Sequence, residues 1–413
     1  MDKLVKPSKY NAELIIPSSK SYMQRAVALA ILSSGTTVLE NPDLSEDSSS
    51  ALKIAEDLGC KVERKPSTIE ITPCGEIKTS EISVGEAGLG LRLFTPVCSL
   101  FGKDLTISGR GSLLNRPMTM LEQPMKELGV KVSLTNGYVP LKISGKLKGG
   151  HIKINGSESS QFLTGLLIAL PKAENDSVIE VENLKSTPYV KMTADIIERF
   201  SANVEIIDYK VFKIKGNQNY KACHYQVEGD WSSAAAHLVA ASVAGKAVIK
   251  GLNPLSLQAD RAILEVLNMV GANVSVLDNE IVVEKNNLHS FVFDATNSPD
   301  LFPVLASLAS NCEGISIIKG VNRLAHKESD RALSIKEEFQ KLGINVELDG
   351  DFMKIQGGKI QGGKIVSSRN DHRMAFALAV AALNANKEIQ ITDAQSVKKS
   401  YPKFWEDFSN SVN

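Results

Sequence analysis

A pattern that returns about every seventy residues constrains the fold of this chain more than any other feature. Each copy begins with small or polar residues, continues as an Ala/Leu-rich helical segment and ends, after a turn, in a β-rich segment, as in SYMQRAVALAILSSGTTVLEN (residues 21–41). The spacings of the equivalent positions are 67, 69, 71, 68 and 73 residues, for Arg25, Arg92, Gln161, Ser232, Asp300 and Arg373. Six repeats therefore fill the chain of 413 residues.

A second helical segment lies inside each repeat and also leads into a strand. LKIAEDLGCKVE (residues 52–63) and EEFQKLGINVEL (residues 337–348) both read as helix, glycine and strand. Each repeat is predicted to be βαβαββ, in an α/β fold. The first helices are apolar on nearly all sides, so we expect them to be buried beneath the second set. Six repeats in two domains predict three per domain, with pseudo-threefold symmetry.

A doubly wound sheet or a solenoid would also alternate helices and strands. No G-x-G-x-x-G follows a predicted strand, which disfavours a dinucleotide-binding sheet. The glycine-rich stretch GGKIQGGKI (residues 357–365) lacks the Ser or Thr and the helix of a nucleotide loop. We expect it to form a hairpin.

The composition limits the possible partners. Lys plus Arg and Asp plus Glu number 47 each, so no overall field favours nucleic acid or an anionic membrane. The five cysteines are scattered without C-x-x-C spacing, which disfavours a disulfide framework and structural zinc. No signal peptide or membrane-spanning stretch is evident. We expect a cytoplasmic protein, and nothing in the sequence requires more than a monomer.

Charged and hydroxyl residues gather where the buried helices are expected to begin. They are Lys20, Ser21 and Arg25; Arg92; Ser159, Ser160 and Gln161; Asp230, Ser232 and Ser233; Asp300; and Asp371, His372 and Arg373. Helix N-termini carry free N–H groups and a positive partial charge, so converging ends suit an anion. Helix capping explains any single Ser or Asp, but it does not explain cations at a helix start.

The second helices begin with another repeated polar set, namely NRPM (115–118), STPY (186–189), ADR (259–261), SDR (329–331) and KKSYP (398–402). HKESDR (326–331) is one copy of this loop. Arg suits bidentate contacts with phosphate and carboxylate, and Asp300 and Glu328 among such cations are candidates for proton transfer. The residues predict a substrate with at least two anionic groups and acid–base chemistry.

Eight ordered motifs carry a resemblance to a known family. They are PSSKSYMQRA (17–26), GEAGLGLR (85–92), NRPM, GSESSQFLTGLL (156–167), VEGDWSSAAAH (227–237), HKESDR, NDHRMAFALA (370–379) and KKSYPKFWEDF (398–408). Together they resemble the 5-enolpyruvylshikimate-3-phosphate synthase family of enolpyruvyl transferases over residues 15–408. The resemblance implies two domains of three repeats, residues 1–17 plus 229–413 and residues 18–228, with the active site in the cleft between them.

The family transfers the enolpyruvyl group of phosphoenolpyruvate to the 5-hydroxyl of shikimate 3-phosphate and releases phosphate. The resemblance therefore implies this reaction, in aromatic amino acid biosynthesis, with no metal and no organic cofactor. Glyphosate targets this family, but the sequence does not establish whether it inhibits this protein.

The resemblance also assigns roles to individual residues. Those implied to bind shikimate 3-phosphate are Ser21, Arg25, Ser159, Ser160, Gln161, Ser186 and Lys327. Those implied to bind phosphoenolpyruvate are Gly88, Arg116, Arg331, Arg373 and Lys399, with Lys20 between the two substrates. The implied catalytic residues are Lys20, Asp300, Glu328, His372 and Lys399. Asp300 would orient or deprotonate the 5-hydroxyl, and Glu328 would handle protons at the C3 methylene.

The sequence departs from the family pattern at two places. Glu86 and Leu89 flank Gly88 where the family usually has N-A-G-T, and Ala325-His326 replaces the common Arg-Val. A carboxylate near a phosphoenolpyruvate pocket would repel the ligand, so we expect Glu86 to be paired or turned away.

Three other functions compete with this interpretation. The sister transferase that acts on UDP-N-acetylglucosamine carries a reactive cysteine in a loop whose counterpart here, GRGSLLNRP (residues 109–117), has none. A non-catalytic anion-binding relative would lose proton-transfer groups that this chain keeps. A metal-dependent hydrolase would need clustered histidines, whereas the six histidines follow neither H-E-x-x-H nor H-x-H spacing.

Overall fold

The computed structural model describes residues 1–73, 76–77, 79–157, 160–278 and 280–412. The chain divides into two compact units: unit 1, Met1–Pro17 with Glu228–Asn413, and unit 2, Ser18–Val227. The second boundary lies one residue before the one expected from the sequence. Within the described ranges, no helix is both long enough and apolar enough to span a membrane.

One repeat of unit 2 shows the predicted βαβαββ order most clearly. Its elements are β11 (His151–Asn155), α5 (Ser160–Ala169), β12 (Ser177–Glu182), α6 (Thr187–Arg199), β13 (Glu205–Ile207) and β14 (Val211–Ile214). The sheet order is β11-β12-β14-β13. The first pair of strands is parallel and the other two pairs are antiparallel.

The other two repeats of unit 2 have the same sheet order. One contains β7 (Glu81–Ser83), α3 (Gly88–Ser99), β8 (Leu105–Ser108), α4 (Glu122–Glu127), β9 (Val130–Thr135) and β10 (Tyr138–Gly145). The other contains α1 (Lys20–Leu32), β4 (Thr37–Glu40), α2 (Glu46–Asp57), β5 (Cys60–Arg64) and β6 (Thr68–Pro73), with β16 (His224–Gln226) as its parallel edge strand. A two-stranded sheet joins β3 (Ser33–Ser34) to β15 (Tyr220–Lys221).

Unit 1 repeats this plan twice in full and once in shortened form. The first repeat has β2 (Tyr10–Ile15), α7 (Trp231–Ala244), β17 (Gly245–Lys250), the 3-10 helix η4 (Ala259–Ala262), α8 (Ile263–Met269), β18 (Asn273–Val276) and β19 (Glu280–Glu284). The second has β20 (Val292–Asp294), η5 (Pro299–Leu301), α9 (Phe302–Ser310), β21 (Ile315–Lys319), α10 (Arg331–Lys341), β22 (Asn345–Asp349) and β23 (Phe352–Gln356). The third has β24 (Lys364–Ser367), α11 (His372–Ala382), β25 (Ile389–Thr392), η7 (Ala394–Lys399) and α12 (Phe404–Asn410), and β1 (Lys3–Val5) completes its three-stranded sheet.

The two crossings between the units exchange the first strands of two repeats. β2 directly precedes α1 in the sequence, yet it pairs in parallel with β17, which follows α7. In the same way, β16 precedes α7 but pairs in parallel with β4, which follows α1. The chain therefore leaves each unit after a first strand and enters the next unit at a first helix.

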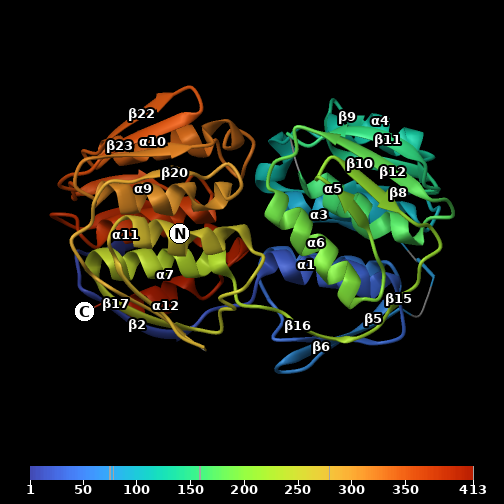
Figure 1. Ribbon diagram of the computed structural model, residues 1–413, viewed down its shortest axis with the longest axis horizontal. Coiled ribbons are helices and arrows are strands. Elements are labelled where there is room, and N and C mark those ends of the chain that lie inside the picture. Colours follow the sequence, from blue (N-terminus) through green and yellow to red (C-terminus); the bar gives the residue numbers. More distant parts are fainter. Residues whose placement is uncertain (74–75, 78, 158–159, 279, 413) are drawn as a thin grey trace. The chain divides into compact units, whose positions relative to one another are not determined.

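Three helices form the centre of each unit, as their apolar sequences predicted. In unit 2, α1, α3 and α5 pack against one another, and in unit 1 the same holds for α7, α9 and α11 (Figure 1). Every residue of α11 is buried. Gly165 allows α5 to approach α3 closely, because a β-carbon there would lie 2.5 Å from the Arg92 carbonyl oxygen.

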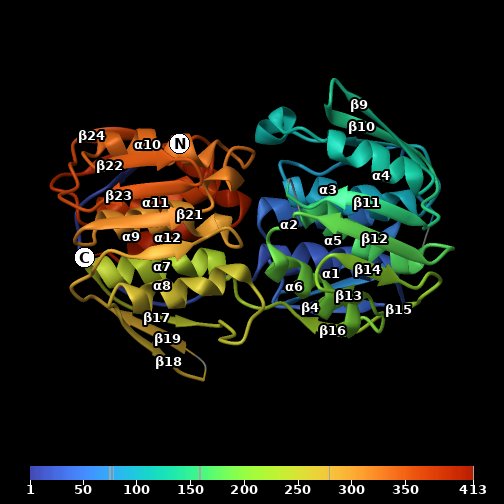
Figure 2. The same cartoon turned by 45° about the horizontal axis from the view of Figure 1, so that its top comes forward.

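The sheets and the second helices lie outside these central helices. In unit 1, α7 packs on β17, α9 on β21 and β23, and α11 on β24 and β25 (Figure 2). In α10, by contrast, only one face is buried. In unit 1 this arrangement places the start of α10 beside the segments that precede α9 and α11. Arg331 at the start of α10 can therefore contact Asp300 and Asp371.

The expected glycine-rich hairpin at residues 357–365 is wrong. Gly357–Gly363 forms a loop, and β24, which follows, pairs in parallel with β25 and not with β23. Gly357 and Gly362 are needed because a β-carbon at either position would lie within 2.0 Å of a backbone carbonyl oxygen. The glycines permit close backbone packing and do not form a turn between paired strands.

Candidate active site

Arg25 is a buried cation in unit 2 whose hydrogen bonds go to neutral oxygens. It lies in the second turn of α1 and donates to Thr193 Oγ1 at 2.9 Å, to the Ser21 carbonyl oxygen at 2.8 Å and to Thr164 Oγ1 at 3.3 Å. Burial lowers the pKa of Arg25 to about 10, because its charged form is poorly solvated. A charged group in such surroundings favours the binding of an anion.

The starts of α3 and α5 are joined by Arg92, whose Nη1 donates to Gln161 Oε1 at 3.1 Å. Ser160, beside Gln161, is buried at the beginning of α5. Ser186 precedes α6 in a left-handed conformation and is also buried. The predicted residue Ser159 lies outside the described residues. The described members of the predicted serine and glutamine set therefore lie at helix starts of unit 2.

Gly88 and Arg116 come together at the start of α3. A β-carbon at Gly88 would lie 2.4 Å from Arg116 Nη1, so the guanidinium fits only because residue 88 has no side chain. Arg116 is buried, and its Nε has no hydrogen-bond partner within the described part of the chain. Arg116 Nε can therefore still donate a hydrogen bond to a further acceptor.

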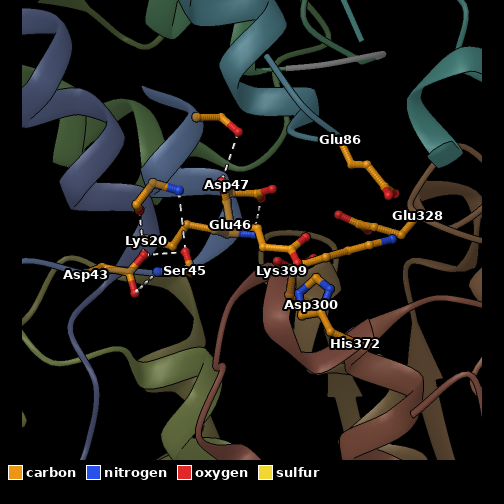
Figure 3. A network of polar contacts seen from close by, with 12 residues as sticks. Lys20, Asp43, Ser45, Glu46, Asp47, Glu86, Asp300, Glu328, His372 and Lys399 are labelled. Carbon is orange, nitrogen blue, oxygen red and sulfur yellow. Dashed lines mark hydrogen bonds and ion pairs between the residues drawn. The ribbon is translucent and has the colours of Figure 1, made fainter. Parts of the chain in front are cut away.

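Lys20 begins α1 and is held by a carboxylate of the neighbouring helix. Its Nζ lies 2.9 Å from Asp47 Oδ2, and both side chains are largely buried (Figure 3). Ser45 caps α2 by accepting from Ser48 N–H, and the Asp43 carboxylate accepts from the Ser45 and Ser48 hydroxyls at 2.5 Å. These contacts fix the start of α2 and thereby the position of Asp47 against Lys20.

The expectation that Glu86 is paired is confirmed. Its Oε2 accepts hydrogen bonds from Ser112 N–H at 3.3 Å and from the Ser112 hydroxyl at 3.4 Å. Leu89, the other departure near Gly88, is buried in the core. Ala325 and His326 are exposed.

In unit 1, Arg331 connects three carboxylates. Its Nη1 donates to Asp300 Oδ1 at 2.6 Å, its Nη2 to Glu328 Oε2 at 2.7 Å and its Nε to Asp371 Oδ2 at 2.8 Å. A longer bond of 3.4 Å joins Nη2 to Asp371 Oδ1. Burial alone would lower the pKa of Arg331, but the three carboxylates together raise it well above its usual value. Four of its five N–H groups are occupied, so its main effect is to orient Asp300 and Glu328.

Asp300 is surrounded by cations. Burial favours its neutral form, but Lys327, Arg331 and Arg373 together hold the pKa of Asp300 well below its usual range. Lys327 Nζ lies 3.6 Å from Asp300 Oδ1, and Arg373 Nη2 lies 3.8 Å from Asp300 Oδ2. Burial, the largest influence, lowers the pKa of Lys327, and Asp300 opposes that shift without cancelling it. Asp300 is therefore ionised at neutral pH.

Arg373 stands at the start of α11, and its N–H is capped by the carboxylate of Asp371 at 2.9 Å. Its side chain is 5% exposed, and Nε and Nη1 find no hydrogen-bond acceptor among the described residues. Buried guanidinium nitrogens of this kind suit a phosphate or carboxylate ligand.

His372 and Lys399 lie in the same unit as Asp300 and Glu328 (Figure 3). His372 is buried with its ring edge-on to Phe376. Lys399 ends η7, is 5% exposed and donates from Nζ to the Asn370 carbonyl oxygen at 2.7 Å. That bond links η7 to the loop before α11. Lys399 therefore contacts the residue that directly precedes Asp371 in the sequence.

Sequence reasoning did not assign several residues that hold the predicted ones in place. Thr164 and Thr193 bind Arg25, and Asp371 binds Arg331 and caps α11. Asp371 had been interpreted only as a polar residue at a helix start, and its second role depends on a contact across 40 positions. Asp260, buried in η4, was noted only as part of the ADR copy of the loop.

The two units thus contain two kinds of chemical group. Unit 2 contains Arg25 with neutral partners, several serine hydroxyls and the buried Arg116 guanidinium beside Gly88, and these groups can bind anions. Unit 1 gathers carboxylates at different positions around one arginine, and Arg373 with two nitrogens available for an acceptor. Paired carboxylates in unlike surroundings can serve as acid and base in one reaction.

Comparisons with known proteins match this sequence over nearly its full length. The family model described as EPSP synthase (3-phosphoshikimate 1-carboxyvinyltransferase) matches residues 4–408. A 3-phosphoshikimate 1-carboxyvinyltransferase of Clostridium kluyveri is 37% identical over 407 residues, covering 98% of this chain and 96% of that protein. One from Clostridioides difficile is 36% identical over 416 residues, covering 97% and 95%.

Solved structures support the fold. EPSP synthase from Acinetobacter baumannii superposes with a TM-score of 0.84 at 24% identity, covering all of this chain and 98% of that one. The enolpyruvyl transferase NikO from Streptomyces tendae gives a TM-score of 0.78 at 16% identity, covering all of this chain and 97% of that one. The predicted two-domain α/β enolpyruvyl-transferase fold is confirmed. By its family model and its relatives over nearly its full length, the chain belongs to the EPSP synthase (3-phosphoshikimate 1-carboxyvinyltransferase) family.

Proposed function

We propose that the protein transfers the enolpyruvyl group of phosphoenolpyruvate to the 5-hydroxyl of shikimate 3-phosphate and releases phosphate. The observation that carries this proposal is the Arg331 cluster, in which one guanidinium positions Asp300 and Glu328 by bonds of 2.6 and 2.7 Å. Family membership supplies the identity of the substrates. Both substrates carry several negative charges, in agreement with the buried cations of each unit.

The reaction needs protons to move at two atoms. In the addition step the 5-oxygen bonds to C2 of phosphoenolpyruvate, its proton leaves, and C3 gains a proton to become a methyl group. In the elimination step the bond from C2 to the phosphate oxygen breaks, C3 loses a proton, and the double bond forms again. One group must therefore act on the hydroxyl, and another must act as acid and then base at C3.

The proposed proton-transfer roles follow from the surroundings of the two carboxylates. Asp300, kept ionised by three cations, orients the 5-hydroxyl and accepts its hydrogen bond. Glu328 gives and then removes the proton at C3, and its bond to Arg331 Nη2 helps to fix its direction. Lys20, His372 and Lys399 assist by stabilising charge that develops during both steps.

The proposed binding roles follow from the cations and hydroxyls. Arg25, whose hydrogen-bond partners among the described residues are neutral, balances the charge of shikimate 3-phosphate. The groups proposed to act with it are Ser21, Ser159, Ser160, Gln161, Ser186 and Lys327. The groups proposed for phosphoenolpyruvate are Gly88, Arg116, Arg331, Arg373 and Lys399. Arg116 and Arg373 contribute most to this binding, because one guanidinium nitrogen of Arg116 and two of Arg373 are buried without an acceptor within the described residues.

The same proposal includes the organisation of the protein. Units 1 and 2 are taken as its two domains, and the protein is taken to act as a cytoplasmic monomer without metal or organic cofactor. Size-exclusion chromatography with light scattering tests the monomer, and activity after dialysis against a chelator tests the independence from metal.

The decisive experiment measures phosphate release from phosphoenolpyruvate with shikimate 3-phosphate, and in parallel with UDP-N-acetylglucosamine. We expect turnover only with shikimate 3-phosphate, and mass spectrometry should show an acceptor that has gained the enolpyruvyl group. Glu328→Gln provides the inactive reference. The proposal would be overturned if phosphate were released only with UDP-N-acetylglucosamine. It would also be overturned if neither acceptor led to phosphate release.

A further inference from the structure

Asp260 is a fully buried carboxyl group in η4 of unit 1 to which no role has been given above. One of its oxygens, Oδ2, accepts a hydrogen bond from the hydroxyl of Ser232 in the first turn of α7. The other, Oδ1, is buried and has no hydrogen-bond partner among the residues that the structure describes. A carboxyl group buried in this way is costly to keep ionised.

Three charged groups of the same unit act on Asp260. They are Asp300 before α9, Arg373 at the start of α11 and Asp230 at the N-cap of α7. Arg373 lies 3.8 Å from Asp300 and keeps two buried nitrogens without an acceptor in the described chain. These four groups form one charged cluster through their electrostatic effects on Asp260, although no ion pair joins Asp260 to Arg373 among the described residues. Asp260 and Arg373 each keep buried atoms without a hydrogen-bond partner in the described chain.

We propose that Asp260 is a positioning residue that takes up one proton when the anionic group of phosphoenolpyruvate binds to Arg373. In the free protein the Asp260 carboxylate compensates part of the Arg373 charge. When the anion of the ligand balances the positive charge of Arg373, the Asp260 carboxylate is protonated and becomes neutral. Its new O–H can then donate a hydrogen bond within the cluster. This inference rests on the proposed function, because that assigns phosphoenolpyruvate to Arg373.

The direction of the proton transfer follows from the electrostatics. Burial, followed by the negative charge of Asp300, raises the pKa of Asp260 to about 7, while Arg373 and the Ser232 hydroxyl oppose the rise and Asp230 adds to it. An anion on Arg373 cancels its opposing effect, so the pKa of Asp260 rises further in the complex. The proton comes from solvent, and no covalent bond changes.

The pH dependence is therefore specific. Well below pH 7, Asp260 is already protonated in the free protein, so binding takes up no further proton there. At pH 7 about half of the molecules must gain one, and above pH 7 nearly all must do so. The dissociation constant of phosphoenolpyruvate should then rise up to about tenfold per pH unit above that point, through Asp260 alone.

The test is calorimetric titration of phosphoenolpyruvate into the protein. The protein is first saturated with the 5-deoxy analogue of shikimate 3-phosphate, which has no 5-hydroxyl to react, so that no turnover occurs. Heats measured in buffers of different ionisation enthalpy give the number of protons taken up. The phosphate of phosphoenolpyruvate also titrates, so the wild type is compared with Asp260→Asn, a neutral carboxyl mimic of similar shape. Asp294→Asn, at an exposed carboxylate paired with Lys319, is the matched control.

We expect the wild type to take up about half a proton more than Asp260→Asn at pH 7, with the difference growing towards about pH 8 and vanishing near about pH 5.5. At about pH 8, Asp260→Asn should bind phosphoenolpyruvate about tenfold more tightly than the wild type. Asp294→Asn should match the wild type throughout. A purely structural role for Asp260 would change stability without changing the proton count.

Ser232→Ala tests the same idea without removing the carboxyl group, and it serves if Asp260→Asn does not fold. The Ser232 hydroxyl favours the charged form of Asp260, so its loss should move the proton-uptake profile to higher pH. Equal proton uptake in the wild type, Asp260→Asn and Ser232→Ala at every pH would overturn the inference. If phosphate is released and phosphoenolpyruvate binds normally, that outcome leaves the proposed function intact. A failure of the wild type to bind phosphoenolpyruvate overturns both.

Discussion

Gly88 and Arg116 lie so close that a single methyl group cannot be placed between them. A β-carbon at Gly88 would lie 2.4 Å from Arg116 Nη1 and 2.8 Å from Arg116 Cζ. The backbone of Gly88 lies at the start of a helix, where alanine is well tolerated, and the end of the Arg116 side chain can move. A methyl group there should therefore displace the guanidinium without unfolding the protein.

The first prediction follows from this contact. Gly88→Ala should raise KM for phosphoenolpyruvate by about 10- to 100-fold, the effect of losing one charge-assisted hydrogen bond. Initial rates at saturating shikimate 3-phosphate measure this. Gly358→Ala is the matched control, because a β-carbon there meets no atom within 4 Å. A Gly88→Ala enzyme with an unchanged KM would show that Arg116 does not bind this substrate.

Glu328→Gln should lower kcat by about 10²- to 10⁴-fold, the usual contribution of a positioned acid or base. The amide oxygen of the variant can still accept from Arg331 Nη2, so the loop keeps its position. Calorimetry should show shikimate 3-phosphate binding within about threefold of wild type. Glu347→Gln, at an exposed carboxylate of β22, should leave kcat unchanged. Turnover of Glu328→Gln within about threefold of wild type would rule out the assigned role.

Arg331→Met should destabilise unit 1, because it leaves the Asp300, Glu328 and Asp371 carboxylates without their common partner. Loss of one member of a buried ion pair costs about 3–5 kcal/mol, which should lower Tm by about 10 °C. Thermal unfolding followed by circular dichroism measures this change. Arg64→Met, at a half-exposed pair with Glu56, should change Tm by about 1–2 °C at most.

The effect of Arg331→Met should depend on pH with a definite sign. The folded pKa of Asp300 lies below its unfolded value, so the wild-type pairing adds stability above about pH 4 and loses it as the pH falls through the folded pKa. In the variant Asp300 loses the nearest of its three cations, so its pKa should rise, and the variant should lose less stability than the wild type as the pH falls. The Tm difference should narrow from pH 7 towards about pH 5, and a constant difference would contradict this account.

Arg25→Met should separate stability from binding. The folded protein holds the Arg25 charge among neutral oxygens, so its removal should leave Tm unchanged or raise it by a few degrees. The affinity for shikimate 3-phosphate should fall by at least about 100-fold, because a buried charged partner of the ligand is lost. Arg199→Met, at an exposed site in the same unit, is the control for both measurements. A variant that melts much lower and still binds the ligand would show that Arg25 is structural.

Glu86→Asn should leave KM for phosphoenolpyruvate within about threefold of wild type, because the carboxylate is already held by Ser112. An unpaired carboxylate facing the ligand would instead repel it by about 1 kcal/mol, or fivefold in affinity. Steady-state kinetics of the variant beside Glu81→Gln, at an exposed position in β7, distinguishes the two cases. A larger improvement in KM would show that Glu86 weakens binding directly.

Sequence pattern alone predicts the six repeats, the βαβαββ order of five of them and the burial of the central helices; the sixth repeat, from β24 to α12, lacks the last two strands of that order. These features depend on local periodicity, because an all-apolar helix must be covered and a glycine after a helix ends it. The motifs also located the charged residues at helix starts, and family resemblance assigned them roles. Asp371 could not be assigned in full in this way. Its position at a helix start is evident from the sequence, but its bond to Arg331 is not, because 40 positions separate the two residues.

The pairing of distant segments follows only from the folded structure. By sequence, β2 and β16 look like the first strands of the repeats that begin with α1 and α7. In the structure β2 pairs with β17, which follows α7, and β16 pairs with β4, which follows α1, because strand pairing depends on contacts remote in sequence. Arg25 finds Thr164 and Thr193 at separations of 139 and 168 residues. The loop at residues 357–363 resembles a turn by composition, but its glycines meet backbone carbonyls of other segments. Burial, ion pairing and the pKa of Asp260 depend on such contacts, and these arise only when the chain has folded.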